Sequence, residues 1–202
     1  MGGTRTVLSP ARRLARAILR GIERGLHRLR RRRVQARLGR QRPPSSVLFV
    51  CHGNICRSPF AAAAFRRRLP PALRASVEIS SAGFVGPGRA SPPEALSAAA
   101  RAGVDLTSHR SRLLTGEDAR RADWIVVMDA RQARAMRDWF GRNGDAVILL
   151  GDLDPEPIEA RPIPDPVAQP EEVFRHVYAR IDRCVSALAG FVVARASGRP
   201  CR

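Results

Sequence analysis

A nine-residue stretch, Cys51-His-Gly-Asn-Ile-Cys-Arg57-Ser58-Pro59, carries the residue types of a nucleophilic site. A cysteine thiolate is a strong nucleophile, and the planar arginine guanidinium can hold two oxygens of a phosphoryl group. The stretch follows the apolar run 47–51 and precedes a helical pattern, so we expect a loop between a buried strand and a helix. The backbone N–H groups and dipole of such a helix start favour an anion and a thiolate.

The other residues of this stretch suit a tight anion-binding loop. Gly53 allows close backbone approach, and Asn54 tolerates a left-handed conformation. Ser58 can donate a hydrogen bond to the Cys51 sulfur. We therefore predict Cys51 as the nucleophile, Arg57 as the phosphate clamp, and a phosphate-binding loop made of His52, Gly53, Asn54, Ile55, Cys56 and Ser58.

A leaving oxygen also needs a proton, and Asp165 is the candidate general acid. It precedes Pro166 in a long loop, residues 152–170, that contains six prolines. On spacing alone, an aspartate before proline is more typical of a turn. With Asp165 included, the residues allow a two-step displacement in which a phosphocysteine forms and water then hydrolyses it.

This set of residues resembles the low-molecular-weight protein tyrosine phosphatases, whose signature is a Cys-x5-Arg-Ser loop near the start of the domain. The resemblance covers about residues 46–190 and includes four further landmarks. They are Ser81-Ala82-Gly83, Ser108-His109-Arg110, Val127-Met128-Asp129 and Asp165-Pro166.

The resemblance implies hydrolysis of phosphotyrosine in proteins, without a metal or other cofactor. It assigns the nucleophile to Cys51, the phosphate clamp to Arg57 and the general acid to Asp165. It also implies a polar network that supports the loop, made of Asn54, Ser58, Ser81 and His109.

The order of the predicted elements indicates an α/β fold. Apolar strands alternate with helical patterns, which argues for a four-stranded parallel sheet with helices on both faces, a flavodoxin-like three-layer sandwich. In such folds the ligand lies beyond the carboxyl ends of the strands. The predicted strands are 47–51, 77–81, 124–128 and 146–150, and the predicted helices are 8–33, 59–69, 93–102, 130–140 and 171–193.

The charge divides the chain into two predicted parts. Residues 1–44 contain 14 arginines and one acid, whereas residues 45–202 contain 22 arginines and 17 acids. The first part has an apolar stripe at helical spacing, so we predict a basic amphipathic helix and linker that lies on an anionic membrane surface. The stripe residues are Ala15, Ile18, Leu19, Ile22, Leu26 and Leu29. A disordered basic tail or a transit peptide remains an alternative. Specific nucleic-acid binding is not expected, because this part has no aromatic residue to stack on bases.

Several observations narrow the function. The family often has aromatic residues near the substrate ring, where this chain has Val167 and Ala168. A phosphoarginine phosphatase and an arsenate reductase share the loop, but the former has threonine at the position of Ile55 and the latter needs further cysteines. A phosphate-binding membrane adaptor is the non-enzyme alternative.

The remaining polar and aromatic residues are given structural roles. No run of about 20 apolar residues and no secretory signal are present, so we expect a cytoplasmic protein with reduced cysteines. Cys184 is expected to be a buried small side chain. Trp124 and Trp139 are expected to serve packing and not recognition. The acidic residues of the long loop are expected to be solvated; they are Asp152, Asp154, Glu156 and Glu159.

Overall fold

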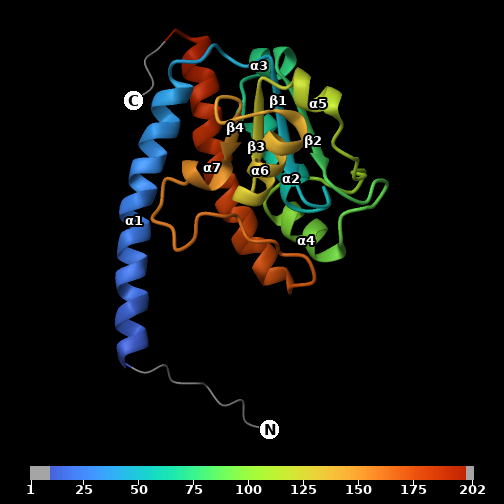
Figure 1. Cartoon of the computed structure of the whole chain (residues 1–202). Coiled ribbons are helices and arrows are strands. Elements are labelled where there is room, and N and C mark those ends of the chain that lie inside the picture. Colours follow the sequence, from blue (N-terminus) through green and yellow to red (C-terminus); the bar gives the residue numbers. More distant parts are fainter. Residues whose placement is uncertain (1–9, 199–202) are drawn as a thin grey trace.

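The computed structural model describes the backbone of residues 10–198 and the side chains of residues 21–198. Its centre is a parallel sheet of β1 (Ser46–Cys51), β2 (Glu78–Gly83), β3 (Trp124–Val127) and β4 (Val147–Leu149), in the order β2-β1-β3-β4 (Figure 1). The predicted four-stranded parallel sheet is confirmed.

Helices cover both faces of this sheet, as predicted. The short segments α3, α5 and the 3-10 helix η1 were not predicted, because four to six residues are too few to show a helical period. The helical elements are α1 (Pro10–Leu38), α2 (Arg57–Arg68), α3 (Pro71–Ser76), α4 (Pro93–Arg101), α5 (Gly116–Arg121), α6 (Ala130–Phe140), η1 (Leu150–Leu153) and α7 (Glu171–Ala196).

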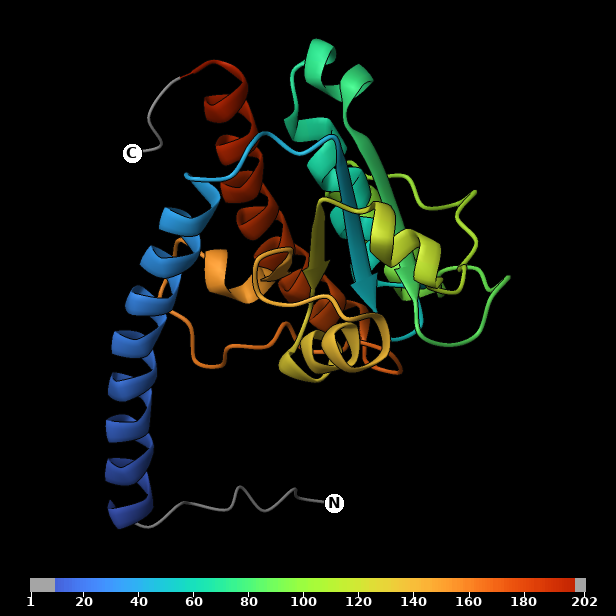
Figure 2. The same cartoon turned by 45° about the horizontal axis from the view of Figure 1, so that its top comes forward.

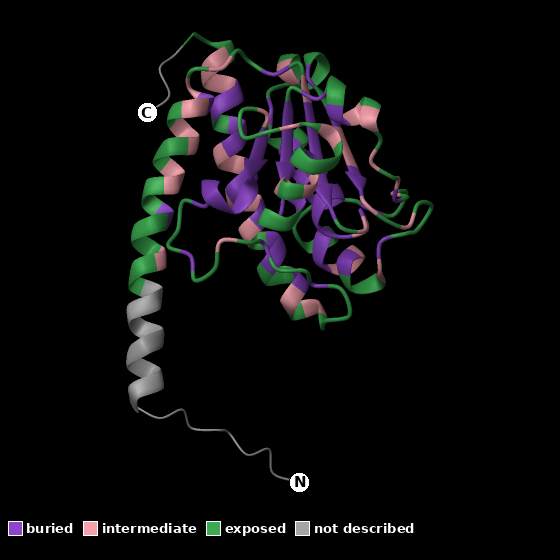
Figure 3. Cartoon of the chain, in the orientation of Figure 1, coloured by how far each residue is buried: buried purple, intermediate pink, exposed green. Residues whose placement is uncertain are grey.

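Alternation along β1 creates the two core layers. Val47 and Phe49 join the larger apolar cluster with α2, α4 and α7, whereas Leu48 and Val50 join the smaller cluster with α5 and α6. Successive strand residues point to opposite faces, so a strand covered on both faces must be apolar throughout. Figure 3 shows the strands as buried elements between the helices.

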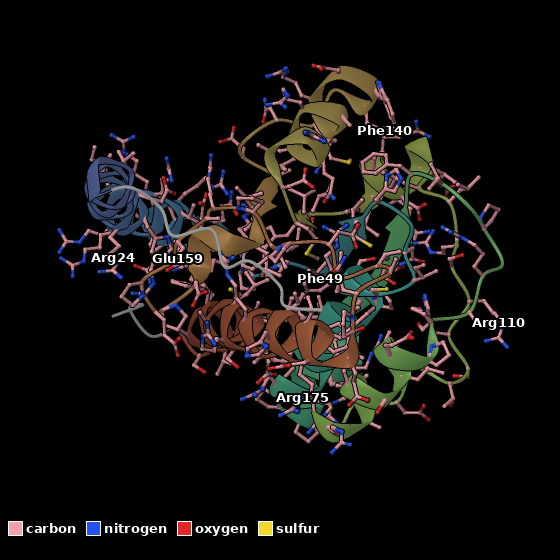
Figure 4. All side chains as sticks on the ribbon, turned by 90° about the horizontal axis from the view of Figure 1, so that it is seen from below. Arg24, Phe49, Arg110, Phe140, Glu159 and Arg175 are labelled. Atoms are coloured by element: carbon pink, nitrogen blue, oxygen red, sulfur yellow. The ribbon has the colours of Figure 1, made fainter. Side chains whose placement is uncertain are left out.

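The topology places the phosphate loop at a favourable point of the sheet. β1 is central, and the chain reaches its two neighbours, β2 and β3, in opposite directions. The arrowheads of β1 and β3 point to the same edge in Figure 2, and Figure 4 views the molecule from that side. In open α/β sheets, ligands bind beyond the carboxyl ends of the strands, at the position where the chain connections from one strand lead to opposite sides. The end of β1 is such a position.

The basic segment forms a long helix along one side of the molecule (Figure 1). The C-terminal half of α1 packs on the domain: Leu38 is fully buried, and His27 Nε2 donates to the backbone oxygen of Asp154 (2.9 Å). The division at residue 44 stays a prediction. The predicted stripe residues Ala15, Ile18 and Leu19 lie outside the described side chains.

None of the described helices is long and apolar enough to span a bilayer. The stripe residues that are described are nevertheless exposed on α1, with exposed fractions of 54% for Ile22, 41% for Leu26 and 45% for Leu29. Most of the described outer surface of this helix is exposed or intermediate in Figure 3. This part of the apolar stripe therefore does not pack on the phosphate-loop domain.

The prediction that the acidic loop is solvated was wrong for its first two acids, Asp152 and Asp154. Asp152 and Asp154 are buried, because each is paired with arginines. Asp152 binds Arg161, and Asp154 lies between Arg180 and Arg183 at 3.0 and 3.3 Å. Sequence spacing gave no sign of partners contributed by a helix some 26 residues later.

The two tryptophans differ in how far their side chains are buried. Trp124 is buried in the core, as predicted, but Trp139 is 67% exposed. It lies on α6 with its ring edge-on to Phe84, at a centroid distance of 5.5 Å. Its helix turns it outward, which the sequence pattern did not indicate.

Candidate active site

The phosphate loop joins the end of β1 to the start of α2. Cys51 is the last residue of β1 and is buried, and Arg57 is the first residue of α2. Cys56 at the helix N-cap makes no side-chain capping hydrogen bond. The first N–H groups of a helix lack partners within it, so this end of α2 suits an anion.

Asn54 is the centre of the network that holds this loop. Its φ of 51° is left-handed, as predicted. Its Nδ2 donates to Ser58 Oγ and Ser81 Oγ, both at 2.9 Å. The Asn54 backbone oxygen accepts from His109 Nε2 (2.7 Å), and its Oδ1 accepts from the backbone N–H of Arg112 (3.0 Å). The structure thus brings the predicted supporting residues together and adds the unpredicted backbone of Arg112.

The two cysteines of the loop have different surroundings. Cys51 Sγ lies 3.0 Å from Ser58 Oγ, which is fully buried. Burial raises the pKa of Cys56 to about 12, with further contributions from Cys51 and Asp165. The Cys56 backbone oxygen accepts a hydrogen bond from the Tyr178 hydroxyl group (3.3 Å). Cys56 is therefore a protonated thiol at neutral pH, unsuited to act as the nucleophile.

Arg57 brings the distant Asp165 to the loop. The Arg57 side chain is 4% exposed, and its Nη2 forms an ion pair with the carboxylate of Asp165, which is 41% exposed. Its Nη1 donates to the backbone oxygen of Ile163 (3.2 Å). Arg57 Nε is buried and has no hydrogen-bond partner in the described part of the chain. The guanidinium therefore holds the Asp165 loop and retains an N–H donor.

Two positions that sequence reasoning missed also shape the loop. A Cβ atom on Gly83 would lie 2.8 Å from the backbone nitrogen of Asn54, so only glycine permits this approach. Arg89 Nη2 donates to the backbone oxygen of Gly53 (3.2 Å). The Ser-Ala-Gly landmark pointed to Gly83, whereas no spacing signal pointed to Arg89.

The comparisons with known proteins agree with this geometry. Residues 46–197 match the family model described as low molecular weight phosphotyrosine protein phosphatase. The low molecular weight protein-tyrosine-phosphatase Etp of Escherichia coli K12 is 36% identical over 141 residues, which cover 69% of this chain and 88% of that protein. The chain belongs to this family. It is therefore a hydrolase of the low-molecular-weight protein tyrosine phosphatase type.

Solved structures of similar proteins share the fold of this phosphatase. Vibrio vulnificus Wzb in complex with benzylphosphonate has a TM-score of 0.63 at 28% identity, over 72% of this chain and 97% of that one. The YwlE arginine phosphatase from Geobacillus stearothermophilus has a TM-score of 0.67 at 26% identity, over 79% of this chain and 99% of that one.

A cleft of about 660 Å³ opens beside the catalytic loop of this phosphatase. It is bounded by the loop itself, by the start of α6 and by the segment that leads to Asp165. The lining residues are His52, Arg57, Asp129, Ala130, Arg131, Gln132, Arg134, Leu149, Arg161, Pro162, Ile163, Pro164 and Asp165.

Ile55 in the phosphate loop and Val167 near Asp165 are both aliphatic residues. Ile55 is half-buried against the main core cluster, and Val167 is 45% exposed. The Val167 backbone N–H donates to Asp165 Oδ1 (3.3 Å), so this residue helps to orient the Asp165 carboxylate.

Proposed function

We propose that this phosphatase hydrolyses phosphotyrosine in proteins through a phosphocysteine, with Cys51 as nucleophile, Arg57 as clamp and Asp165 as general acid. The observation that carries the proposal is the ion pair between Arg57, in the same loop as Cys51, and Asp165, which lies 108 positions later in the chain. This ion pair lies at the start of α2, which has no side-chain cap. The free Nε of Arg57 supports binding of a phosphoryl oxygen.

The first step exchanges a phosphorus–oxygen bond for a phosphorus–sulfur bond. The Cys51 thiolate attacks phosphorus, while Asp165 gives its proton to the leaving phenolic oxygen. A bound phosphoryl dianion competes with Asp165 for the Arg57 guanidinium. Arg57 and the loop N–H groups stabilise the charge on the transferring phosphoryl oxygens.

The second step regenerates the enzyme. Water attacks the phosphorus of phosphocysteine and the phosphorus–sulfur bond breaks, so Cys51 leaves as a thiolate. The Asp165 carboxylate takes the proton of the attacking water, and inorganic phosphate is released. Ser58 Oγ, at 3.0 Å from the sulfur, stabilises the leaving thiolate by a hydrogen bond.

The depth of the nucleophile supports an aryl ester as the substrate. Cys51 is only 2% exposed, so the phosphoryl group must be delivered on a long side chain. Ile55, half-buried beside the loop, favours the flat phenyl ring over a guanidinium group. Phosphoarginine, which the YwlE name indicates for that relative, is the alternative substrate. Cys184 does not suit the arsenate reductase alternative, because burial in the core raises its pKa.

The direct test is turnover of p-nitrophenyl phosphate and of matched phosphotyrosine and phosphoarginine peptides. We expect activity on the first two substrates and its loss in Cys51→Ser. Preferred hydrolysis of phosphoarginine would contradict the substrate assignment, and wild-type activity in Cys51→Ser would contradict the mechanism.

We also propose that α1 associates peripherally with an anionic membrane surface. The exposed apolar residues Ile22, Leu26 and Leu29 lie on a helix rich in arginine, which suits the boundary between lipid headgroups and acyl chains. In Figure 4, Arg24 on α1 and Glu159 in the long loop lie on the same side of the molecule, away from the sheet.

A further inference from the structure

A positive region adjoins the proposed catalytic groups. The cleft described above extends from Arg57 and Asp165 to the first turns of α6, where Arg131 and Arg134 line it. Both α6 arginines are exposed. Neither guanidinium forms an ion pair or hydrogen bond with any residue in the described part of the chain, so both retain their donors for a ligand.

Asp129 also lines the cleft and forms no ion pair with these arginines in the described part of the chain. Asp129 Oδ1 accepts the backbone N–H groups of Arg131 (2.8 Å) and Gln132 (2.9 Å), and Oδ2 accepts Gln132 Nε2 (3.0 Å). Asp129 is therefore engaged as the cap of α6. Asp129 keeps its negative charge as a helix cap, but the cleft lining holds four arginines against two carboxylates, Asp129 and Asp165, and so remains net positive.

The other arginine in the lining beside segment 162–164, Arg161, has a structural role. Arg161 donates two hydrogen bonds to buried Asp152, at 2.8 and 2.7 Å, so its charge is compensated. Leu149 and the segment 162–164 add apolar atoms to the lining. The cleft thus combines apolar atoms with two arginine side chains that have no ion-pair partner in the described part of the chain, as a binding site for a charged peptide segment requires.

We propose that this cleft binds acidic side chains that flank the phosphotyrosine of the protein substrate, with Arg131 and Arg134 as the specificity-determining residues. The inference rests on the proposed phosphotyrosine activity. Because the cleft is continuous with Arg57 and Asp165, chain neighbours of a bound phosphotyrosine fall within it, one extended residue spanning about 3.3 Å. Its volume lies within the range of about 300–1,000 Å³ typical of ligand sites.

The test compares two phosphotyrosine peptides of equal length. One carries Glu and Asp on both sides of the phosphotyrosine, and the other carries Gln and Asn at the same positions. For the wild-type enzyme at low ionic strength, we expect kcat/KM to be about tenfold higher for the acidic peptide, since each of two exposed charge pairs contributes modestly. Added salt should reduce this ratio.

Variants of α6 locate the effect. In Arg131→Gln/Arg134→Gln the ratio should fall to about twofold or less, and Arg131→Lys/Arg134→Lys should restore most of it. Arg137→Gln is the matched control, because Arg137 is exposed on the same helix, pairs with Asp138 and does not line the cleft. Each ratio is taken within one variant, so a change in turnover common to both peptides cancels.

Three outcomes would overturn the proposal: equal kcat/KM for the two wild-type peptides, an unchanged ratio in the double Gln variant, or an equal fall in Arg137→Gln, which would indicate net charge alone. Absence of p-nitrophenyl phosphate turnover by the wild-type enzyme would instead refute the phosphatase mechanism on which the inference rests.

Discussion

Cys51 Sγ and Ser58 Oγ lie 3.0 Å apart, and Ser58 also accepts a hydrogen bond from Asn54. Because Asn54 donates to the hydroxyl oxygen, the Ser58 proton can point at the sulfur, which is nearer than its other acceptor, the backbone oxygen of Ala82 at 3.4 Å. This arrangement stabilises a thiolate both as nucleophile and as leaving group.

Ser58→Ala should therefore slow hydrolysis of the phosphocysteine more than its formation. We expect kcat to fall about tenfold or more, for a charge-assisted hydrogen bond of about 1.5–3 kcal/mol. Rapid-quench measurements should show more phosphoenzyme at steady state than in the wild type. A fall in kcat without phosphoenzyme accumulation would show that Ser58 does not assist the second step.

Asp165→Asn should slow hydrolysis of phosphotyrosine by about 10²–10⁴-fold, the usual contribution of a general acid. The loss should be smaller for aryl phosphates whose phenols are strong acids, since their leaving oxygens need no proton. Measuring kcat/KM across a series of aryl phosphates tests this dependence, because kcat/KM reports the first step and excludes phosphocysteine hydrolysis, in which Asp165 also acts. An equal loss for every leaving group would remove Asp165 from the acid role and leave it as a partner of Arg57.

The raised pKa of Cys56 predicts selective alkylation of the loop. The Cys56 thiol should stay protonated at every pH below about 12, so iodoacetate at pH 7 should modify Cys51 and spare Cys56. Peptide mass spectrometry after partial inactivation identifies the modified residue. Equal modification of the two cysteines would show that burial does not keep the Cys56 thiol unreactive.

Cys56 should nevertheless protect Cys51 from irreversible oxidation. Peroxide converts the Cys51 thiolate to a sulfenic acid, and attack by the Cys56 sulfur forms a disulfide with loss of water. Dithiothreitol should then restore activity to the wild type and much less to Cys56→Ser. Full recovery of that variant after the same peroxide treatment would show that Cys56 gives no protection.

The exposed stripe of α1 allows a membrane test that leaves the core intact. Deleting residues 1–44 would remove buried Leu38, so Ile22→Gln/Leu26→Gln/Leu29→Gln is the cleaner variant. We expect full-length wild-type protein to co-sediment with anionic liposomes at low salt, and this variant to bind much less. Added salt should weaken wild-type binding.

The controls for this test are turnover and lipid charge. The Gln variant should keep its kcat on p-nitrophenyl phosphate, because the stripe does not contact the phosphate loop. Wild-type protein that stays in the supernatant with anionic liposomes, or that binds neutral liposomes equally well, would refute the membrane proposal.

The sequence alone determined the local chemistry of this phosphatase. The apolar run of β1, the Cys-x5-Arg spacing and Pro59 within the first turn of α2 are properties of contiguous residues, so local backbone preferences and burial suffice to predict them. The same reasoning predicted the left-handed Asn54 and the parallel order of strands and helices.

Only the tertiary structure decided which distant groups meet. The pairing of Arg57 with Asp165, the burial of Asp154 between two arginines of α7, and the cleft beside α6 all join segments far apart in the chain. An acidic residue in a Pro-rich loop looks solvated in sequence, because its type does not reveal whether a cation from another element will compensate its desolvation. That compensation depends on packing, which sequence spacing does not encode.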